Sequence, residues 1–341
     1  MKPILSISLK AIQNNYRHLQ SICAAEIAAA VKADAYGLGA SKIVPALYDA
    51  GCRKFFVATI DEGVDIASRM DDVSIYILNG FTESTMHFLI DHNLIPVINT
   101  PEQLNLWQDR QCAIHIDTGM NRLGMNLDDF TKHHALPHNV EFLMSHLACD
   151  GDEQNPYNKK QLEKFIAATA KYPQIRKSLA ASGGAFLGPE YHFDMIRAGA
   201  AIYGLGARRH DKLQNPVSLY APIIQIRKCV EDEYVGYGAT RLAKKGSVLA
   251  TIPLGYADGF SRFLSNNGLL YLGNKPVEIM GRISMDLTII DVTEHEAKLG
   301  DMVEILGPNL YPDDLAERTG TIGYEVITSL KQGRFAREYI S

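Results

Sequence analysis

Hydrophobic positions in the first two thirds of the chain form short apolar runs that alternate with segments of helical periodicity. Eight of these runs have the length of a buried strand, namely 27–31, 54–58, 74–78, 94–98, 113–116, 140–144, 179–181 and 195–196. Helices are predicted between most of them, among others at 9–22, 41–50, 61–69, 101–107 and 157–172. Eight strand–helix repeats predict an α/β fold, a (β/α)8 TIM barrel. The last two repeats are the weakest, because residues 183–194, GGAFLGPEYHFD, are too rich in glycine to predict a helix.

From about Asn215 the pattern changes to alternating β-branched residues separated by glycine and asparagine turns. We therefore expect the barrel to cover residues 9–215 and a mostly-β second domain to cover 216–341. The first segment, ILSISL, also alternates, so residues 1–8 are a candidate strand of the second domain. The length of 341 residues agrees with about two domains of roughly 150 residues each.

Composition excludes several classes of protein. A net charge of -5 with interspersed signs disfavours binding to nucleic acid or anionic lipid. No apolar run is long enough to span a membrane and no secretory leader is apparent, so we expect a cytoplasmic protein. The five cysteines form no C-x-x-C pair and predict reduced, buried thiols. The histidines His133, His134 and His138 lack further ligands at a useful spacing, so we expect a solvated loop there and no metal site.

Catalytic side chains of a TIM barrel follow its strands, which makes polar residues directly after the apolar runs the candidates. Lys32 follows the run IAAAV and precedes a glycine-containing loop with Tyr36. A lone lysine is more often a rim residue whose stem lies along apolar surface. Burial at a strand end lowers the pKa of a lysine, however, and lets it form a Schiff base with a carbonyl compound or with pyridoxal phosphate, PLP.

Other candidates follow the later strands. Arg122 lies in a glycine turn, where its guanidinium can bind a carboxylate, although an ion pair with the aspartate of DTG is the ordinary alternative. His146 follows the sixth run, where a histidine is more often a hydrogen-bonded core residue. Ser182 and Gly199, with Arg197 just before it, follow the last two runs, where barrels commonly bind phosphate. Together with Lys32, this set points to a phosphorylated aldehyde cofactor and an amino-acid substrate.

Eight motifs carry a resemblance to a known family: AVKADAYGLG, HIDTGMNRLGM, SHLACD, FDMIRAGAAIYG, VGYGAT, IPLGYADGF, GRISMD and GYEV. In their order and separations they cover nearly the whole chain, which strongly resembles alanine racemase. The resemblance implies a PLP-dependent isomerase with a barrel and a C-terminal β domain. It also implies a homodimer with composite active sites that supplies D-alanine for peptidoglycan.

The resemblance further implies residue roles. Lys32 would bind PLP and act as one base, and Tyr237 of the partner subunit would be the second. The other implied cofactor contacts are Tyr36, His146, Ser182, Arg197, Gly199, Ala200 and Tyr324. Arg122 and the backbone of Met285 would bind the substrate carboxylate, and the entrance would be lined by Tyr256 and Arg282.

This chain departs from the family pattern at three positions. His115 stands where the family often has a carbamylated lysine that supports the arginine, so no carbamate can form there. Ala181 and Ala198 replace an asparagine and a proline of the two phosphate turns. His115 can support Arg122 directly, through a chloride ion or not at all, and the sequence is compatible with all three.

Inversion of a stereocentre needs one base on each face of the α-carbon. Lysine and tyrosine ordinarily have pKa values near 10, so both must be lowered, the lysine by burial and neighbouring cations, and the tyrosine by positive charge on Arg197 and His146. The alternatives are an amino-acid racemase of broader range or with a preference for serine, a PLP-dependent decarboxylase, and a non-catalytic PLP carrier. VGYGAT and GRISMD argue against the decarboxylase, and the long second domain argues against the carrier.

Overall fold

A computed structural model describes residues 2–107, 110–132, 136, 139–206, 210–331 and 333–341. Contacts between Cα atoms divide the chain into two compact units. One unit comprises residues 12–35 and 39–202, and we call it the barrel unit. The other comprises residues 1–11, 36–38 and 203–341, and we call it the β unit.

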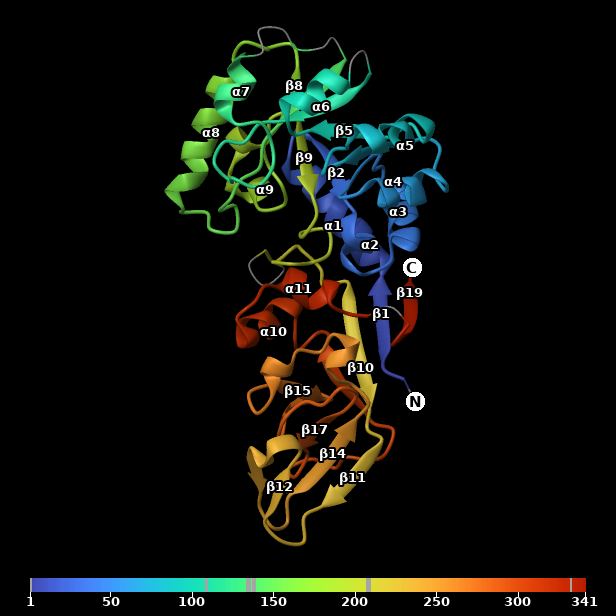
Figure 1. The fold of residues 1–341 in the computed structure, drawn as a ribbon. Helices are drawn as coiled ribbons and strands as arrows, with labels where there is room; N and C mark the ends of the chain where they lie inside the picture. Colours follow the sequence, from blue (N-terminus) through green and yellow to red (C-terminus); the bar gives the residue numbers. More distant parts are fainter. Residues whose placement is uncertain (1, 108–109, 133–135, 137–138, 207–209, 332) are drawn as a thin grey trace. The chain divides into compact units, whose positions relative to one another are not determined.

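The barrel unit is built on eight parallel strands (Figure 1). Their order in the sheet is β8-β7-β6-β5-β4-β3-β2-β9. The strands are β2 (Glu26–Ala30), β3 (Lys54–Val57), β4 (Ser74–Ile77), β5 (Ile95–Ile98), β6 (Cys112–His115), β7 (Val140–Met144), β8 (Arg176–Ser178) and β9 (Met195–Ala198). Backbone hydrogen bonds from Asp194 to Lys177 (3.0 Å) and from Arg197 to Ala180 (3.1 Å) bring the two ends of this sheet together.

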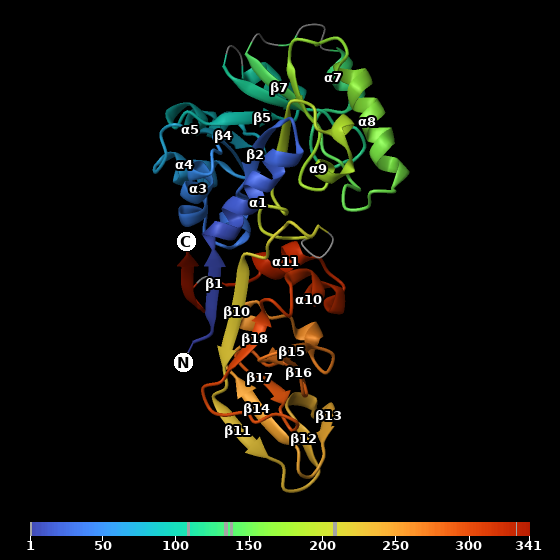
Figure 2. The ribbon, with the colours of Figure 1, turned by 180° about the vertical axis from the view of Figure 1, so that it is seen from behind.

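Helices connect the strands and cover the outside of the sheet. They are α1 (Leu9–Ile22), α3 (Ala40–Asp49), α4 (Ile60–Ala67), α5 (Met86–Asp91), α6 (Pro101–Leu106), α7 (Leu127–Lys132), α8 (Pro156–Thr169) and α9 (Gly184–Leu187), with 3₁₀ turns η1 (Glu83–Thr85) and η2 (Pro189–Tyr191). Figures 1 and 2 show α3, α4 and α5 side by side on one flank. The predicted TIM barrel is confirmed, and all five predicted helices are present.

One predicted strand is wrong. The run 179–181 lies just beyond β8, which consists of Arg176, Lys177 and Ser178. These polar residues form a barrel strand because each finds a partner. Arg176 pairs with Glu26 at 2.7 Å, Lys177 donates to backbone carbonyls, and Ser178 Oγ donates to Met195 O at 2.7 Å. A search for apolar runs cannot detect such a strand.

The amino ends of the strands enclose an ion pair. Lys54, the first residue of β3, forms an ion pair with Glu141 of β7, and both side chains are 15% exposed. Tyr76 Oη donates to Glu141 Oε2 at 2.6 Å, and Gln111 Nε2 donates to the same oxygen at 2.7 Å. Burial raises the pKa of Glu141, but the hydrogen bonds from Lys54 and Tyr76 outweigh it and leave that pKa below its ordinary value.

The β unit holds a six-stranded sheet in the order β16-β15-β18-β10-β1-β19. Its strands are β1 (Ile4–Ser8), β10 (Val217–Pro222), β15 (Leu269–Leu272), β16 (Lys275–Glu278), β18 (Met302–Leu306) and β19 (Ala336–Ile340). Strand β1 is antiparallel to β10 and parallel to β19, and Figure 2 shows it lying beside β10. The alternating start of the chain is thus a strand of this sheet.

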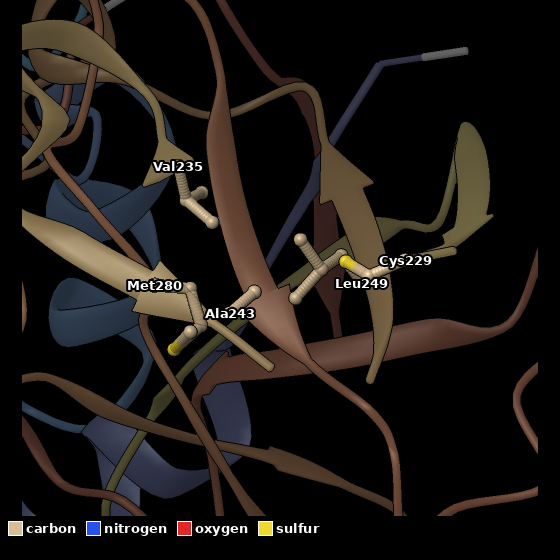
Figure 3. Packing of buried hydrophobic residues seen from close by; sticks show 5 residues of the cluster. All are labelled: Cys229, Val235, Ala243, Leu249 and Met280. Atoms are coloured by element: carbon tan, nitrogen blue, oxygen red, sulfur yellow. The ribbon is translucent and has the colours of Figure 1, made fainter. Parts of the chain in front are cut away.

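Smaller sheets and two helices complete the β unit. Strands β11 (Gln225–Lys228), β14 (Val248–Ile252) and β17 (Thr288–Asp291) form one sheet, and β12 (Glu233–Val235) and β13 (Arg241–Ala243) form another. The helices are α10 (Pro312–Thr319) and α11 (Gly323–Thr328), with 3₁₀ turns η3 (Tyr237–Ala239), η4 (Tyr256–Asp258) and η5 (Arg262–Leu264). A buried cluster of Cys229, Val235, Ala243, Leu249 and Met280 packs between these strands (Figure 3).

Two features of composition are visible in the structure. All five cysteines are free and four are buried, whereas Cys149 is partly exposed, contrary to the prediction that all are buried. Among the described residues, no helix combines the length and hydropathy needed to cross a membrane, and no three His, Cys, Asp or Glu side chains form a group that could hold a metal. His133, His134 and His138 lie outside the described residues.

Candidate functional site

Lys32 follows β2 and is itself followed by a left-handed turn at residues 33–36. Ala33, Asp34, Ala35 and Tyr36 all have φ between 52° and 58°, so the segment labelled α2 (Lys32–Tyr36) is not an ordinary helix. An L-residue in this conformation costs roughly 1–2 kcal/mol, because its Cβ crowds the following carbonyl oxygen. Four such residues in succession, placed where a barrel performs its chemistry, therefore mark a functional segment.

Hydrogen bonds on both sides hold this turn. Ala35 N donates to Val31 O at 2.9 Å, and Gly39 N donates to Asp34 O at 2.9 Å. The Asp34 carboxylate accepts a further hydrogen bond from Ala40 N at 2.8 Å, at the start of α3. The turn is thus fastened at its start to Val31, the residue after β2, and at its end to α3.

Lys32 is half-buried, and its amine makes no hydrogen bond or ion pair among the described residues. Burial lowers the pKa of its amine, and the positive charge of Arg122 lowers it further, while the carboxylate of Glu62 opposes both. A lowered pKa agrees with the prediction that Lys32 forms a Schiff base.

Arg197 of β9 lies fully inside the barrel. Its Nη1 donates to Ser178 O at 2.8 Å, and its Nη2 donates to Ser145 O at 2.5 Å. Burial lowers the pKa of Arg197 to about 9, partly offset by Asp150, which still leaves the guanidinium charged at neutral pH. The arginine is therefore a fixed positive charge whose position is set by backbone carbonyls.

His146 lies 3.4 Å from Arg197, between Nδ1 and Nη2. Because a guanidinium can only donate, Nδ1 is the acceptor and the proton of the neutral ring is on Nε2. Burial and the charges of Arg197 and Arg122 hold the pKa of His146 well below its ordinary value. The expectation that His146 supplies positive charge is thus wrong, because the ring is neutral and only the arginine carries charge.

Ser182 and the turn after β9 form a small cradle of backbone N–H groups. Ser182 Oγ accepts hydrogen bonds from Gly199 N at 2.9 Å and Ala201 N at 3.1 Å. Ala200, a residue that is 5% exposed, has an N–H group without an acceptor among the described residues. An anion bound here would provide the acceptor that this amide lacks.

Asp150 was not singled out in the sequence, yet it supports this cradle. Its carboxylate accepts hydrogen bonds from the backbone of Gly184 and Gly183, and burial raises its pKa despite these bonds. A Cβ at Gly183 would lie 2.4 Å from Asp150 O, so only glycine fits there. The motif SHLACD contains this aspartate, but nothing in its spacing indicated the contact.

Arg122 lies in the loop that follows β6, and the end of this loop pairs again with the end of β6. Met125 N donates to His115 O and Asp117 N donates to Met125 O, both at 2.8 Å. The Asp117 carboxylate accepts from the backbone of Gly119 and Met120, so the alternative ion pair with Arg122 is absent among the described residues. The guanidinium has no hydrogen-bonded partner in that part of the chain and can receive a carboxylate.

His115 is held as a single neutral tautomer. The amide of Asn99 donates to Leu78 O at 2.9 Å and Val97 O at 3.0 Å, so its oxygen faces His115 Nδ1 at 3.0 Å and that nitrogen carries the proton. Burial lowers the pKa of His115 to about 4, with Arg197 adding to the effect. No hydrogen bond joins His115 to Arg122 among the described residues.

The β unit contains the remaining predicted residues. The ring of Tyr36 lies 4.5 Å from that of Tyr203 and 5.9 Å from that of Tyr324, between centroids. Arg337 of β19 donates to Gly37 O at 3.0 Å, and Tyr339 Oη donates to Leu38 O at 2.9 Å. The segment that follows the left-handed turn is therefore held by the last strand.

Three predicted residues of the β unit face solvent in a single chain. Tyr237 is 71% exposed, Met285 is 54% exposed and Tyr256 is 44% exposed. The guanidinium of Arg282 lies against Gly238, where a Cβ would approach Nη1 to 2.8 Å. Tyrosine and methionine side chains this exposed are available to another molecule.

A barrel whose strand ends gather a lysine, two arginines and a cradle of backbone amides defines an enzyme of the TIM-barrel class with a site for a small anion. Two family models match the chain, the N-terminal domain of alanine racemase at residues 7–207 and the C-terminal domain at residues 216–339. The chain therefore belongs to the alanine racemase family.

Individual relatives agree with this assignment. Alanine racemase of Rickettsia canadensis is 45% identical over 353 residues, covering 98% of each chain. The crystal structure of alanine racemase from Bartonella henselae with covalently bound pyridoxal phosphate is 37% identical, with a TM-score of 0.95 and full coverage of both chains. The biosynthetic alanine racemase of Pseudomonas aeruginosa is 30% identical, with a TM-score of 0.92 over 100% of this chain and 99% of that one.

Proposed function

We propose that the protein is a PLP-dependent alanine racemase that interconverts L-alanine and D-alanine by two-base proton transfer. The observation that carries the proposal is the lysine of lowered pKa that follows β2 and precedes a left-handed turn. Full-length similarity to alanine racemases, one of them with covalently bound pyridoxal phosphate, supports it.

The residues present fit pyridoxal phosphate. Its aldehyde suits the Lys32 amine, and its phosphate suits Ser182 and the backbone amides of Gly199 and Ala200, the last of which lacks an acceptor among the described residues. Arg197 would donate to the pyridine nitrogen and keep it unprotonated, because a charged guanidinium has no proton acceptor. Bound there, PLP supplies the electron sink that acidifies the α-carbon of the amino acid.

Tyr36 and Tyr324 are assigned to the phosphate from the β unit, where their rings already lie close together. We also assign residues 9–215 to the cofactor-binding barrel and 216–341, with strand 1–8, to the second domain. The matched ranges of the family models lie within or close to these boundaries. Contacts between Cα atoms instead group residues 9–11, 36–38 and 203–215 with the β unit.

Lys32 holds or removes the α-proton on one face of the substrate, because its lowered pKa leaves a larger neutral fraction of the amine. Tyr237 of the partner subunit serves the other face, so the active form is a homodimer with composite sites. The high exposure of this tyrosine in one chain agrees with a role in a second copy. Neutral His146, with its proton on Nε2, has one N–H group to donate, and Arg197 supplies the charge.

Arg122 binds the substrate carboxylate with its guanidinium, which no described residue engages, and the backbone of Met285 adds to this contact. We place the enzyme in the cytoplasm, where it supplies D-alanine for peptidoglycan. Pocket size decides between alanine and larger substrates, so an amino-acid racemase of broader range or one preferring serine is the alternative.

Incubation with PLP in D2O and a panel of L-amino acids tests the reaction. We expect D-alanine carrying one deuterium, formed much faster than any other D-amino acid. Equal rates with serine would favour the broader enzyme. Deuterium uptake without inversion would show that no second base acts on the other face of the substrate. No uptake at all would contradict the proposal.

Mixing two inactive variants tests the shared site. Hybrid dimers of Lys32→Ala and Tyr237→Phe contain one intact site if the tyrosine comes from the partner, so activity should return to about a quarter to a half of that expected for the wild type. Lack of recovery, despite subunit exchange shown by mass spectrometry of differently tagged chains, would overturn the composite site.

A further inference from the structure

The carboxylate of Glu62 accepts hydrogen bonds from three backbone N–H groups. Oε2 accepts from Ala58 N at 2.8 Å and Thr59 N at 3.2 Å. Oε1 accepts from Ala33 N at 2.6 Å. Ala33 is the residue that follows Lys32 and the first of the left-handed turn.

Two of these contacts belong to an ordinary helix start. Helix α4 begins at Ile60, and Thr59 and Glu62 form a capping box in which Thr59 Oγ1 accepts from Glu62 N at 3.4 Å. The cap uses Oε2 of Glu62 and leaves Oε1 free to bind elsewhere. The contact with Ala33 joins segments 29 residues apart and adds nothing to the cap itself.

The same carboxylate faces the charge of the lysine. Lys32 interacts with the positive Arg122 and the negative Glu62, and His146 also lies within the electrostatic reach of Lys32. Glu62 opposes the lowering of the lysine pKa that burial and Arg122 produce. It therefore offsets part of the effect of the positive charge on Arg122.

We propose that Glu62 is a positioning residue for Lys32, which holds the strained turn by its hydrogen bond to Ala33 N and directs the amine toward the cofactor aldehyde. This inference rests on the proposed function, because it assumes that Lys32 binds PLP. The left-handed turn needs an external contact at its first residue, since Ala33 has no glycine-like freedom to adopt it. Glu62 supplies that contact with a charge-assisted hydrogen bond.

The test compares two cofactor forms on the full-length protein stripped of cofactor. Pyridoxal phosphate forms a bond to Lys32, whereas pyridoxamine phosphate has no aldehyde and reports only on the phosphate and ring contacts. For Glu62→Ala we expect the dissociation constant for pyridoxal phosphate to rise about tenfold while that for pyridoxamine phosphate changes less than about twofold. Absorbance of the lysine adduct measures the dissociation constant for pyridoxal phosphate, and fluorescence quenching measures that for pyridoxamine phosphate.

Thr59→Ala is the matched control, because it removes the other half of the capping box and leaves the contact between Glu62 and Ala33 in place. It should leave the ratio of the two dissociation constants unchanged. Glu62→Gln, with one acceptor oxygen for three N–H groups, should give an intermediate ratio. Equal weakening of both cofactor forms by Glu62→Ala, or the same ratio change from Thr59→Ala, would overturn the inference.

The proposed function and the role of Glu62 fail on different results. If the wild-type protein forms no adduct with pyridoxal phosphate at Lys32, by peptide mass spectrometry after borohydride reduction, the proposed function fails. If the wild type forms the adduct and Glu62→Ala leaves the ratio unchanged, only the role of Glu62 is refuted. If Glu62→Ala does not fold, the ratio of the two dissociation constants is compared between Glu62→Gln and Thr59→Ala. A changed ratio in Glu62→Gln alone supports the role of Glu62, and the same ratio in both variants refutes it.

Discussion

At the amino ends of the barrel strands, Lys54 and Glu141 form a largely buried ion pair, and Tyr76 and Gln111 donate hydrogen bonds to Glu141. At the carboxyl ends, Lys32 and Arg122 form no ion pair among the described residues, and Arg197 is held by uncharged groups. The amino ends of the strands thus carry a neutral pair of opposite charges, whereas the carboxyl ends carry positive charges that form no ion pair with any described residue. In the described part of the chain, Glu62 and Asp150 act on Lys32 and Arg197 without forming an ion pair with either. Buried positive charge without an ion-pair partner costs free energy, so the carboxyl end is organised for an anionic ligand and not for stability.

The comparison predicts a separation of effects: substitutions at the carboxyl end should change activity at little cost in stability, and those at the amino end should do the reverse. The largest expected effect is for Lys32→Ala. Loss of the cofactor bond and of one base should lower racemisation by about a thousandfold or more, while the melting temperature of the cofactor-free protein stays close to that of the wild type. Circular dichroism measures the melting temperature and a racemisation assay measures the activity. Retained activity would contradict the expected separation of effects between the two ends of the barrel.

Glu141→Ala should have the opposite profile. It leaves Lys54 partly buried without a counter-ion, and we expect the free energy of unfolding to fall by about 3 kcal/mol, with kcat of the folded fraction unchanged. Urea denaturation measures the loss. Replacing both partners by methionine should recover most of it, because an apolar pair leaves no buried charge. A larger loss in the double variant than in the single one would contradict this reasoning.

The neutral histidines at the carboxyl end predict a dependence of stability on pH. The pKa of His115 is about 4 when folded and near 6.5 when unfolded, so between these values the unfolded chain binds more protons and stability falls as pH falls. Relative to pH 7, the loss at pH 5 from this residue should be about 2 kcal/mol. His115→Gln should show a flatter decline of unfolding free energy over that range. An equal slope in the two proteins would contradict a neutral His115.

A smaller effect is expected for Tyr324→Phe. The ring contact with Tyr36 remains, and only a hydroxyl assigned to the phosphate is lost. Affinity for pyridoxal phosphate should fall about fivefold, and affinity for pyridoxamine phosphate should fall equally, because both carry the phosphate. This equal change separates a phosphate contact from the effect proposed for Glu62. Selective weakening of pyridoxal phosphate alone would assign Tyr324 another role.

The sequence predicted the barrel because its strands and helices carry regular periodicities. Helix α1 was predicted at residues 9–22 and lies there, since its apolar residues recur at helical spacing. Strand β8 was placed wrongly because Arg176 and Lys177 gain their partners only in the tertiary structure. A search for apolar runs therefore fails where a strand is stabilised by polar contacts.

The residues of the candidate site were predicted through their motifs. The backbone conformation and the neighbouring side chains that hold these residues in place were not predicted. Ala33 and Ala35 belong to a residue type that favours right-handed helices, so nothing in the sequence indicates their positive φ. Asp150 and Glu62 act through contacts with residues 29 or more positions away. Local patterns carry no information on such contacts, and only the folded chain reveals them.

The pairing of β1 with β10 and β19 has a consequence for synthesis on the ribosome. Strand β1 (Ile4–Ser8) emerges first, but its partners β10 (Val217–Pro222) and β19 (Ala336–Ile340) are made more than two hundred and three hundred residues later. At roughly 5–20 residues per second, the strand waits about 15–65 s for its last neighbour. Until those partners are made, its backbone N–H and C=O groups lack their native strand neighbours, which leaves the segment open to pairing with other strands.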